Sequence, residues 1–333
     1  MTVRIIIGDT RDKLRALPSD SVDCCVTSPP YYGLRDYGVA GQIGLEETPD
    51  AYISELVGVF REVRRVLKPT GTLWLNLGDS YAGANGSGSQ GVTGQRASRT
   101  FTASTIPKLG KPKDLLMIPA RVALALQSDG WWLRSEIIWA KPNPMPESVT
   151  DRPTSAHEKI YLLAKSERYF FDSDAVAEPA IYHGLTGQDP SGFKNPENFN
   201  GKHKDGYRSN RSDKQRGHGR RHQGFNERWD AMERAEQCSG MRNIRNVWTI
   251  ATQPFSEAHF ATFPPSLIEP CIKAGSPKGG TVLDPFGGAG TTGLVADRFE
   301  RNAILIELNP EYAVMAERRI RGDAPMFASV EAA

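Results

Sequence analysis

The chain has 333 residues, with 41 lysines and arginines against 39 aspartates and glutamates, so its net charge of +2 excludes no class of partner. Its length allows one large α/β domain with insertions or two modest domains, and 39% hydrophobic residues argue against a disordered chain. Four cysteines without a Cys-x-x-Cys pair indicate neither zinc nor a disulfide framework, and no apolar run approaches the roughly 18 residues of a membrane helix, so we expect a cytoplasmic protein.

Strands and helices alternate along most of the chain, as apolar runs and helical periodicities indicate. We expect strands over 3–7, 22–27, 72–77, 131–139, 159–164, 281–283 and 303–306, and helices around 14–17 and over 50–67, 115–126, 265–274, 291–298 and 310–320. The turn residues Pro69-Thr70-Gly71 are expected to end the 50–67 helix. This alternation predicts an α/β fold with a doubly wound, mostly parallel sheet covered by helices on both faces.

Two polar segments interrupt the alternation. Residues 82–113 are rich in glycine, serine, threonine and basic residues and predict a mobile loop, and residues 181–246 form a second polar insertion. Between 200 and 222 the second segment carries two acids and eight basic residues, which are Lys202, Lys204, Arg208, Arg211, Lys214, Arg216, Arg220 and Arg221. Such a cluster is either a solvated loop or a nucleic-acid contact surface, and composition alone does not decide between the two.

A glycine-rich loop near the C-terminus has the context of a nucleoside-binding site. The loop, Asp284-Pro285-Phe286-Gly287-Gly288-Ala289-Gly290, lies between the strand over 281–283 and the helix over 291–298. Its glycines allow close approach of a ligand, and the start of the helix offers free N–H groups. Glu307 ends the next strand, where its carboxylate can accept both ribose hydroxyls. The plain alternative is an ordinary turn with a surface glutamate.

The same loop differs from the loops that bind phosphate. It lacks the third spaced glycine of the pyrophosphate fingerprint and the Gly-Lys-Ser/Thr of a P-loop. S-adenosylmethionine has no phosphate, so this loop suits it better than it suits a dinucleotide. We therefore expect S-adenosylmethionine as the cofactor.

A second chemical motif, Ser28-Pro29-Pro30-Tyr31, follows the strand over 22–27. Its prolines make a rigid turn that aims acceptors at one point, since the Ser28 hydroxyl and the Pro29 carbonyl can take both N–H bonds of a planar primary amine. Accepting both bonds favours a pyramidal nitrogen and localises its lone pair, while Tyr31 would stack on the base that carries the amine. Taken alone, the motif is more often a proline turn with a core tyrosine.

The order of these motifs resembles the β arrangement of the amino-directed DNA methyltransferases, in which the catalytic motif precedes the target-recognition region and the cofactor motif comes last. The resemblance covers residues 1–80, 114–180 and 250–320, and minor motifs agree at Gly8-Asp9, residues 139–144, His157-Glu158 and residues 259–265. It implies a Rossmann-like S-adenosylmethionine-dependent methyltransferase fold. The catalytic domain would span 1–180 and 247–333, with 181–246 inserted as a basic target-recognition region.

The resemblance also implies a role for each matching residue. Ser28, Pro29, Pro30 and Tyr31 would engage a base flipped out of duplex DNA. The residues implied to hold S-adenosylmethionine are Asp9, Asp284, Phe286, Gly288, Gly290, Thr291, Thr292 and Glu307, with Glu307 on the ribose. The eight basic residues between 200 and 222 would contact the DNA, and no metal is implied. The implied reaction is methyl transfer to an exocyclic amino group, either cytosine N4 or adenine N6.

Several questions stay open at this point. Serine in the first motif position is common among cytosine-N4 enzymes, yet adenine-N6 enzymes with serine occur, so the target base is undecided. RNA and protein-glutamine methyltransferases also place proline turns on planar amines and amides, but the chain order and the basic insertion favour DNA. The intact motifs speak against a binding protein with an inactive cofactor site. By analogy we expect a homodimer that binds DNA in the nucleoid. Whether a cognate endonuclease exists is left open by the sequence.

Three further residues and one geometric expectation complete the sequence analysis. Pro270-Cys271 superficially resembles the Pro-Cys of carbon-methylating enzymes, but Cys271 lies in an amphipathic helix and is expected in the core. His157 and His259 lack ligand-spaced partners and are expected to hydrogen-bond or pack. The strand ending at Asp284 must lie beside a strand ending at Asp9 or Thr27, so that Ser28 and Gly288 flank one cleft.

Overall fold

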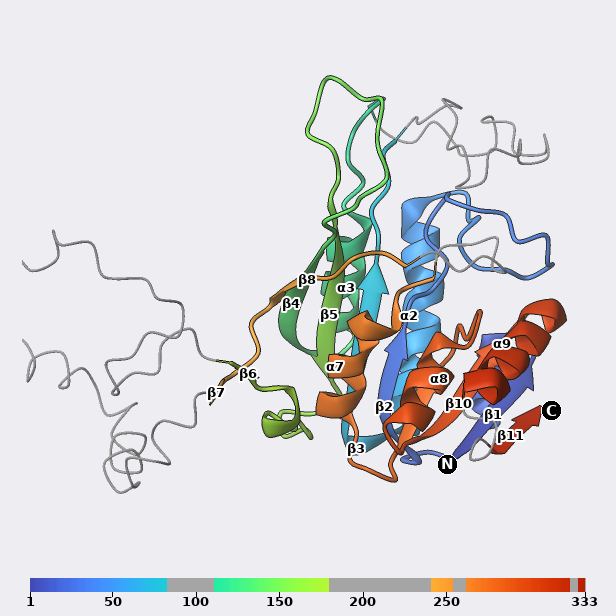
Figure 1. Ribbon diagram of the computed structural model, residues 1–333. Coiled ribbons are helices and arrows are strands. Elements are labelled where there is room, and N and C mark those ends of the chain that lie inside the picture. Colours follow the sequence, from blue (N-terminus) through green and yellow to red (C-terminus); the bar gives the residue numbers. More distant parts are fainter. Residues whose placement is uncertain (83–110, 180–240, 254–261, 324–328, 333) are drawn as a thin grey trace, which may run out of the picture. The chain divides into compact units, whose positions relative to one another are not determined.

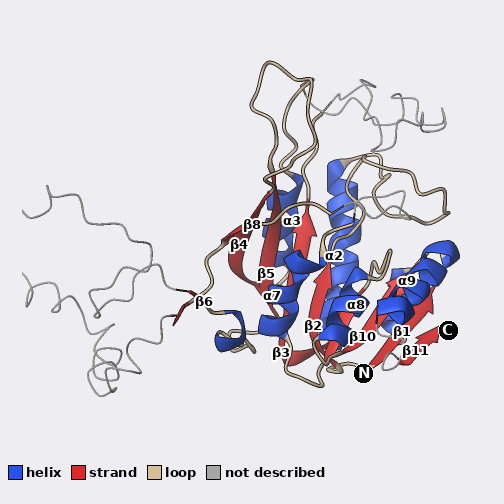
Figure 2. Ribbon diagram, viewed as in Figure 1, coloured by secondary structure: helices blue, strands red, loops and turns tan. Residues whose placement is uncertain are grey.

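A sheet of nine strands is the centre of the fold, in the order β11-β1-β10-β9-β2-β3-β5-β4-β8 (Figures 1 and 2). The computed structural model describes residues 1–82, 111–179, 241–253, 262–323 and 329–332. Within these residues β5 (His157–Ala164) is antiparallel to both of its neighbours, and every other pair in the sheet is parallel. The predicted α/β fold with a mostly parallel sheet is confirmed.

The elements follow the predicted alternation of strands and helices. The remaining strands are β1 (Thr2–Ile7), β2 (Val22–Thr27), β3 (Leu67–Leu77), β4 (Trp132–Ala140), β6 (Glu178–Pro179), β7 (Met241–Arg242), β8 (Val247–Thr249), β9 (Thr281–Asp284), β10 (Asn302–Glu307) and β11 (Ser329–Ala332). The helices are α1 (Thr10–Arg15), α2 (Pro49–Val66), α3 (Ile118–Ser128), the short 3-10 turn η1 (Asp174–Val176), α7 (Pro265–Gly275), α8 (Thr291–Arg298) and α9 (Pro310–Asp323). Both β2 and α8 have the predicted bounds.

Helices cover both faces of the sheet. In Figure 1, α7, α8 and α9 lie on the near face, where each contacts the next, while α2 and α3 lie on the far face and α2 also contacts α1. The largest hydrophobic cluster lies under α2, where Tyr52, Leu56 and Phe60 are fully buried against strands that include Leu73 and Leu75 of β3. Their spacing along α2 puts them on one side of the helix, which is why this segment folds as a surface helix.

The junction between α2 and β3 corrects one prediction. Pro69-Thr70-Gly71 was expected to end the helix, but α2 ends at Val66 and those residues lie inside β3. Leu67 is fully buried and pairs with Val22 of β2, so the chain enters the sheet directly after the helix. The proline is tolerated because it stands near the start of the strand, before the regular ladder with β2 begins at Thr72.

One other element bound needed correction, and two edge strands were missed. The helix expected from residue 115 begins at Ile118, because Leu115 forms a bridge with Tyr81 and the Asp79 carboxylate caps Ile118 N–H at 2.9 Å. The edge strands β8 and β11 were not predicted. Both are short, and burial on β8 is limited to its central Trp248, so neither carries the long apolar run that marks a central strand.

Residues Ala177–Ile244 form a second compact unit, separate from the rest of the chain. Its described part is the antiparallel pair β6–β7, with an ion pair of 3.5 Å between Arg242 and Glu178. The eight basic residues predicted to contact DNA, the predicted loop over 82–113 apart from its ends, and His259 lie outside the described residues. The expected division at residues 180 and 247 stays a prediction.

Gly290 is a position where the fold requires glycine. Its φ is +75°, and a Cβ there would lie 2.7 Å from the Ala316 Cβ of α9. Gly290→Ala should therefore lower the free energy of unfolding by about 2–4 kcal/mol, from left-handed strain plus overpacking. The matched control is Gly58→Ala, because Gly58 lies inside α2 with nothing within 4 Å of an added Cβ. That change should stabilise by up to about 1 kcal/mol. Chemical denaturation of both variants tests this, and equal effects would contradict it.

Candidate active site at the carboxyl edge of the sheet

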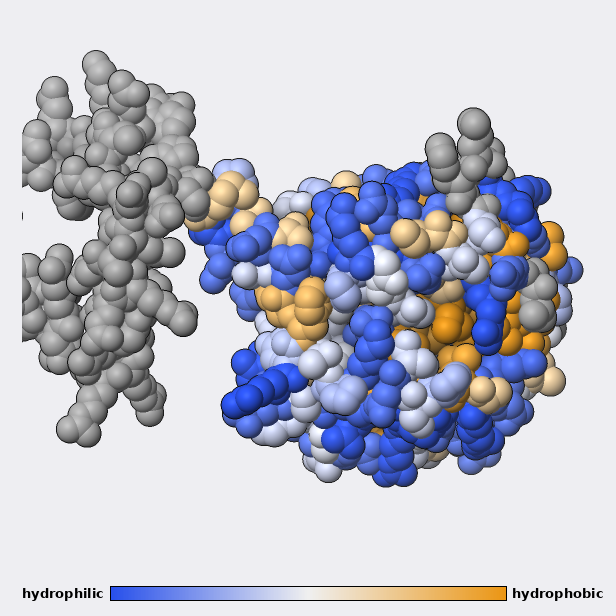
Figure 3. Space-filling model, turned by 90° about the horizontal axis from the view of Figure 1, so that it is seen from below, coloured by the Kyte–Doolittle hydropathy of each residue, from blue (hydrophilic) through white to orange (hydrophobic). Residues whose placement is uncertain are grey.

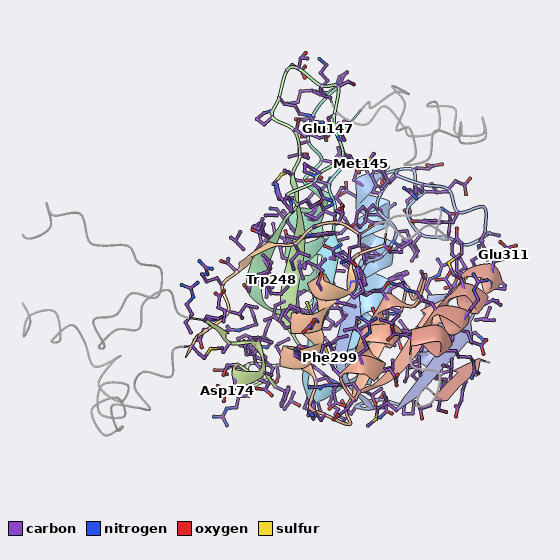
Figure 4. The ribbon with its side chains drawn as sticks, viewed as in Figure 1. Met145, Glu147, Asp174, Trp248, Phe299 and Glu311 are labelled. Atoms are coloured by element: carbon purple, nitrogen blue, oxygen red, sulfur yellow. The ribbon has the colours of Figure 1, made fainter. Side chains whose placement is uncertain are left out.

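Two motifs that are far apart in the sequence lie side by side in the sheet. Strand β9 pairs with β2 through Cys24–Val282 and Cys25–Leu283, so their carboxyl ends, Asp284 and Thr27, meet at one edge. The glycine loop follows the first of these residues and Ser28 follows the second. The predicted neighbourhood of the strand ending at Asp284 and the strand ending at Thr27 is confirmed. In Figure 4, Met145 and Glu147 lie on the β4–β5 connection, which rises from the same edge.

Asp284 joins the two motifs from inside the protein. It is 2% exposed, and its carboxylate accepts hydrogen bonds from Thr27 Oγ1 at 2.7 Å, Thr292 Oγ1 at 2.7 Å and the Phe286 N–H at 3.0 Å. Burial raises the pKa of Asp284, and these hydrogen bonds oppose the rise. Asp284 and Thr292 were both predicted to hold the cofactor. In the structure their side-chain hydrogen bonds connect β2, β9 and α8.

The glycine loop is closed by backbone hydrogen bonds and by Glu307. Gly287 N–H donates to the Ile306 carbonyl at 2.8 Å, and Gly288 N–H donates to Glu307 Oε2 at 2.7 Å. The other oxygen of that carboxylate accepts the Asn309 N–H at 2.8 Å. Burial raises the pKa of Glu307, and the two backbone donors lower it in part. The predicted ribose ligand is thus held rigidly beside the loop, with lone pairs left on both oxygens.

Three residues near Glu307 were not predicted. Burial raises the pKa of Tyr37 and Tyr312, the Glu307 charge raises both further, and Arg35 lowers both. The charges of Glu307 and Arg35 therefore both act on these two tyrosines, in opposite directions. The sequence held one usable signal, because Tyr312 lies in the first turn of the helix that follows Glu307. Tyr37 and Arg35 lie in a loop without any motif.

Thr291 and Asp9 have partners within the chain. Thr291 is buried, and its Oγ1 accepts a 2.8 Å hydrogen bond from Arg319 of α9. Asp9 follows β1, two residues after the Ile7 that pairs with Glu307, and it caps α1 by accepting the Arg11 N–H at 2.9 Å. The Arg11 guanidinium also bonds this carboxylate and holds the pKa of Asp9 below its ordinary value. Both side chains are thus fixed beside the predicted cofactor position.

The Ser28 turn is held from behind by a polar cluster. Ser28 Oγ donates to the Tyr31 hydroxyl at 3.3 Å, and that hydroxyl donates to Glu158 Oε2 at 2.7 Å. Asn76 Nδ2 donates to the Tyr31 hydroxyl at 2.9 Å and to Glu158 Oε2 at 3.0 Å. The Lys141 ammonium bonds Glu158 Oε1. Sequence analysis noted Lys141 and Glu158 as motif residues without a role, and the pairing of β3, β5 and β4 brings them here.

The Tyr31 side chain is held in place by its neighbours. Its ring packs on Gly78, where an added Cβ would lie 2.5 Å from the ring. Burial raises the pKa of the Tyr31 hydroxyl well above its ordinary value, and the Glu158 charge raises it further. The adjacent Pro30 carbonyl accepts the Tyr52 hydroxyl at 2.8 Å, which fixes the turn to α2. The proline turn is therefore rigid on both sides.

Two residues set aside by the sequence analysis are placed by the structure. Cys271 is 1% exposed in α7, and burial raises the pKa of its thiol well above the ordinary value, so it is a core residue as predicted. His157 is exposed at the start of β5, so it does not pack in the core, and its expected hydrogen-bonding role stays a prediction. Among the described residues no group of His, Cys, Asp and Glu is arranged to hold a metal ion, and no helix is long and apolar enough to cross a membrane.

A cavity of about 480 Å³ lies at the opposite edge of the sheet, where the strands begin. Lys278, Phe299 and Arg301 are among the residues that line it, and Figure 4 labels Phe299 at this end of the molecule. Figure 3 views this edge from below and shows mainly hydrophilic residues with hydrophobic ones between them. The Ser28 turn and the glycine loop both lie at the other edge of the sheet, so the cavity is not part of the candidate active site.

The buried Asp284 cluster makes a stability prediction. Thr292→Val keeps the shape of the side chain but leaves the buried carboxylate one donor short, which should lower the free energy of unfolding by about 1–3 kcal/mol. Thr10→Val is the matched control, since the buried Thr10 hydroxyl has no partner among the described residues. Thr10→Val should leave the free energy of unfolding unchanged or raise it. Urea denaturation compares the two, and an equal loss would show that the Thr292 bond contributes nothing.

Comparison with known proteins agrees with this geometry. The sequence model of the family described as DNA methylase, N6_N4_Mtase, matches residues 22–318. The chain is 44% identical over 316 residues to the type II methyltransferase M.XycI of Xanthomonas campestris pv. cyanopsidis, covering 95% of this chain and 86% of that protein. It is 42% identical over 317 residues to the type II methyltransferase M.SmaI of Serratia marcescens, covering 95% and 90%.

Solved structures show the same fold at lower identity. The cytosine-N4-specific PvuII DNA methyltransferase is 18% identical with a TM-score of 0.60, over 99% of this chain and 96% of that one. A putative DNA modification methylase from Thermus thermophilus, complexed with S-adenosyl-L-methionine, is 24% identical with a TM-score of 0.56, over 99% of both chains. With the family match and the close relatives, this chain belongs to the S-adenosylmethionine-dependent DNA methyltransferases that modify an exocyclic amino group, cytosine N4 or adenine N6.

Proposed function

We propose that the Ser28 turn binds the exocyclic amino group of a base flipped out of duplex DNA while the glycine loop and Glu307 hold S-adenosylmethionine beside it. One observation carries this assignment of roles. The 2.7 Å hydrogen bond between Thr27 and Asp284 joins the strand before the Ser28 turn to the strand before the glycine loop. An amine and a methyl donor bound at the two loops would thus meet at one edge, held by rigid elements.

The residues of the loop fit S-adenosylmethionine. Each Glu307 oxygen takes one backbone N–H, from Gly288 or Asn309, and keeps a lone pair for one ribose hydroxyl. Helix α8 starts at Gly290 without a side-chain cap, so its first N–H groups stay available to the amino-acid end of the ligand. When bound, S-adenosylmethionine supplies a methyl group on a positively charged sulfur.

The chain's own residues supply orientation and electrostatics. The target amine is a weak nucleophile because its lone pair is delocalised into the ring of the base. Ser28 Oγ and the Pro29 carbonyl would accept its two N–H bonds and localise that lone pair toward the methyl group. Asp284 and Thr292 act from the interior by keeping the two loops in register.

The remaining roles stay predictions. The eight basic residues between 200 and 222 are proposed to contact phosphates of the DNA. Stacking of Tyr31 on the base is compatible with a ring anchored on Gly78. A homodimer would help to read a symmetric site, and sedimentation of the free protein measures it.

A methyl-transfer assay tests the proposed catalytic role. The protein is incubated with mixed-sequence duplex DNA and methyl-labelled S-adenosylmethionine, and the labelled nucleoside is identified by mass after digestion. We expect label on cytosine N4 or adenine N6, and a loss of about 100-fold or more in Ser28→Ala. Ser21→Ala, just before β2, is the control and should keep the full rate. Wild-type rate in Ser28→Ala would overturn the assignment. Label on RNA or protein amides, but not on DNA, would overturn DNA as the substrate.

A binding measurement tests the cofactor role of Glu307. Glu307→Gln should weaken S-adenosylmethionine binding roughly 10- to 100-fold, because the ribose hydroxyls lose a charged acceptor. The pKa of Glu307 is raised, and only its ionised form is the strong acceptor, so wild-type affinity should fall as the pH drops through a value above 4.5. The glutamine variant should lack that fall. Calorimetry from about pH 5 to 8 measures both, with Glu300→Gln at the opposite edge as the control.

A further inference from the structure

The hydrogen bonds behind Ser28 have a fixed direction. An ionised carboxylate only accepts, so the Tyr31 hydroxyl must give its hydrogen to Glu158. With its hydrogen used, that hydroxyl accepts from Asn76 Nδ2 and from Ser28. The Ser28 hydrogen therefore points inward to Tyr31, and what Ser28 offers outward is a lone pair.

That direction matches what an exocyclic amine requires. An amine presents two N–H donors, and a serine that turned its own hydrogen outward would oppose them. Resting on the proposed function, we propose that Glu158 is a positioning residue that fixes Ser28 as an acceptor and, through Tyr31, takes up the proton that the methylated amine loses.

The proposed step balances in atoms and charge. The amino nitrogen forms a bond to the methyl carbon as the carbon–sulfur bond breaks, and the sulfur keeps that electron pair. The nitrogen then carries one proton too many. It passes a proton to Ser28 Oγ as the Ser28 hydrogen moves to Tyr31 and the Tyr31 hydrogen moves to Glu158. The products are a neutral methylated base, restored hydroxyls and a protonated Glu158.

The surroundings of Glu158 suit this role. Its side chain is 18% exposed and that of Lys141 is 17% exposed, so the pair is largely shielded from water. Lys141 also lies 4.3 Å above the Trp139 ring, which holds the ammonium in place beside the carboxylate. Burial raises the pKa of Tyr31 well above its ordinary value, so Tyr31 passes a proton on rather than losing it. Asn76 lies 5% exposed between the hydroxyl and the carboxylate and keeps them in register.

Two variants remove the relay without removing volume. Glu158→Gln leaves an acceptor for Tyr31 but no charge and no site for the proton, and Tyr31→Phe keeps the ring on Gly78. The chain offers a close control in Glu136→Gln. Glu136 also accepts hydrogen bonds from a tyrosine hydroxyl, Tyr161 at 3.2 Å, and from a lysine, Lys159 at 3.3 Å. Unlike Tyr31, Tyr161 is not bonded to Ser28.

The measurement is the single-turnover rate of methyl transfer to the same mixed-sequence duplex, with separate titrations of DNA and S-adenosylmethionine binding. Glu158→Gln and Tyr31→Phe should each slow transfer about 100-fold or more, with the affinities for DNA and for S-adenosylmethionine unchanged. The double variant should be no slower than either single one, because both remove the same relay. Glu136→Gln should keep the wild-type rate.

Several outcomes would overturn the inference. Wild-type transfer rates in Glu158→Gln would do so while leaving the proposed function intact, as would multiplying losses in the double variant. If Glu158→Gln lost its cooperative unfolding transition, Tyr31→Phe alone would decide, and a full rate there would end the relay. A wild-type protein that labels no DNA base would instead overturn the proposed function, and this inference with it.

Discussion

One buried hydrogen bond, from Thr27 to Asp284 across 257 residues of chain, sets the geometry on which the active site depends. It lies where two neighbouring parallel strands end, so it fixes where both functional loops begin. Methyl transfer needs a nitrogen, a carbon and a sulfur in line, and misplacement by an ångström costs orders of magnitude in rate. A protein that supplies no covalent chemistry must supply that alignment, and this bond is buried where water cannot loosen it.

Three carboxylates divide the work of the site according to their partners. Asp284 is enclosed by two hydroxyls and a backbone donor and has become part of the scaffold. Glu307 is held only by backbone donors and keeps capacity for a ligand. Glu158 has a lysine on one oxygen and a tyrosine on the other, which makes it the charged end of a chain of hydroxyls. The same chemical group thus stands in three different surroundings at one edge of a sheet, which suit it to structure, to the proposed cofactor binding and to the proposed proton transfer.

Local sequence patterns predicted the bounds of individual strands and helices, but they missed the features that depend on which strands pair. The apolar run over 22–27 and the helix over 291–298 came out with the right bounds, because burial and periodicity specify them residue by residue. The predicted end of α2 was wrong because the pairing of Leu67 with β2 outweighs the tendency of Pro-Thr-Gly to mark the end of a helix. Among site residues, the motif members came together as expected. The partnership of Tyr31 with Glu158 depends on β5 lying next to β3, which no periodicity encodes.

The strand order has a consequence for how the enzyme comes into being. Among the residues that the structure describes, β1 pairs with β10 and β11 alone, and β9 lies between β10 and β2. A ribosome makes β1 and β2 before β9 and β10, but β1 and β2 do not pair with each other, and the strands that join them in the sheet are made more than 250 residues later. Closing such distant contacts is slow, and the half-made sheet exposes open edges meanwhile. The Ser28 turn and the glycine loop can therefore meet only after β9 and β10 have been made, and until then the edges of β1 and β2 that these strands will cover stay open to other chains.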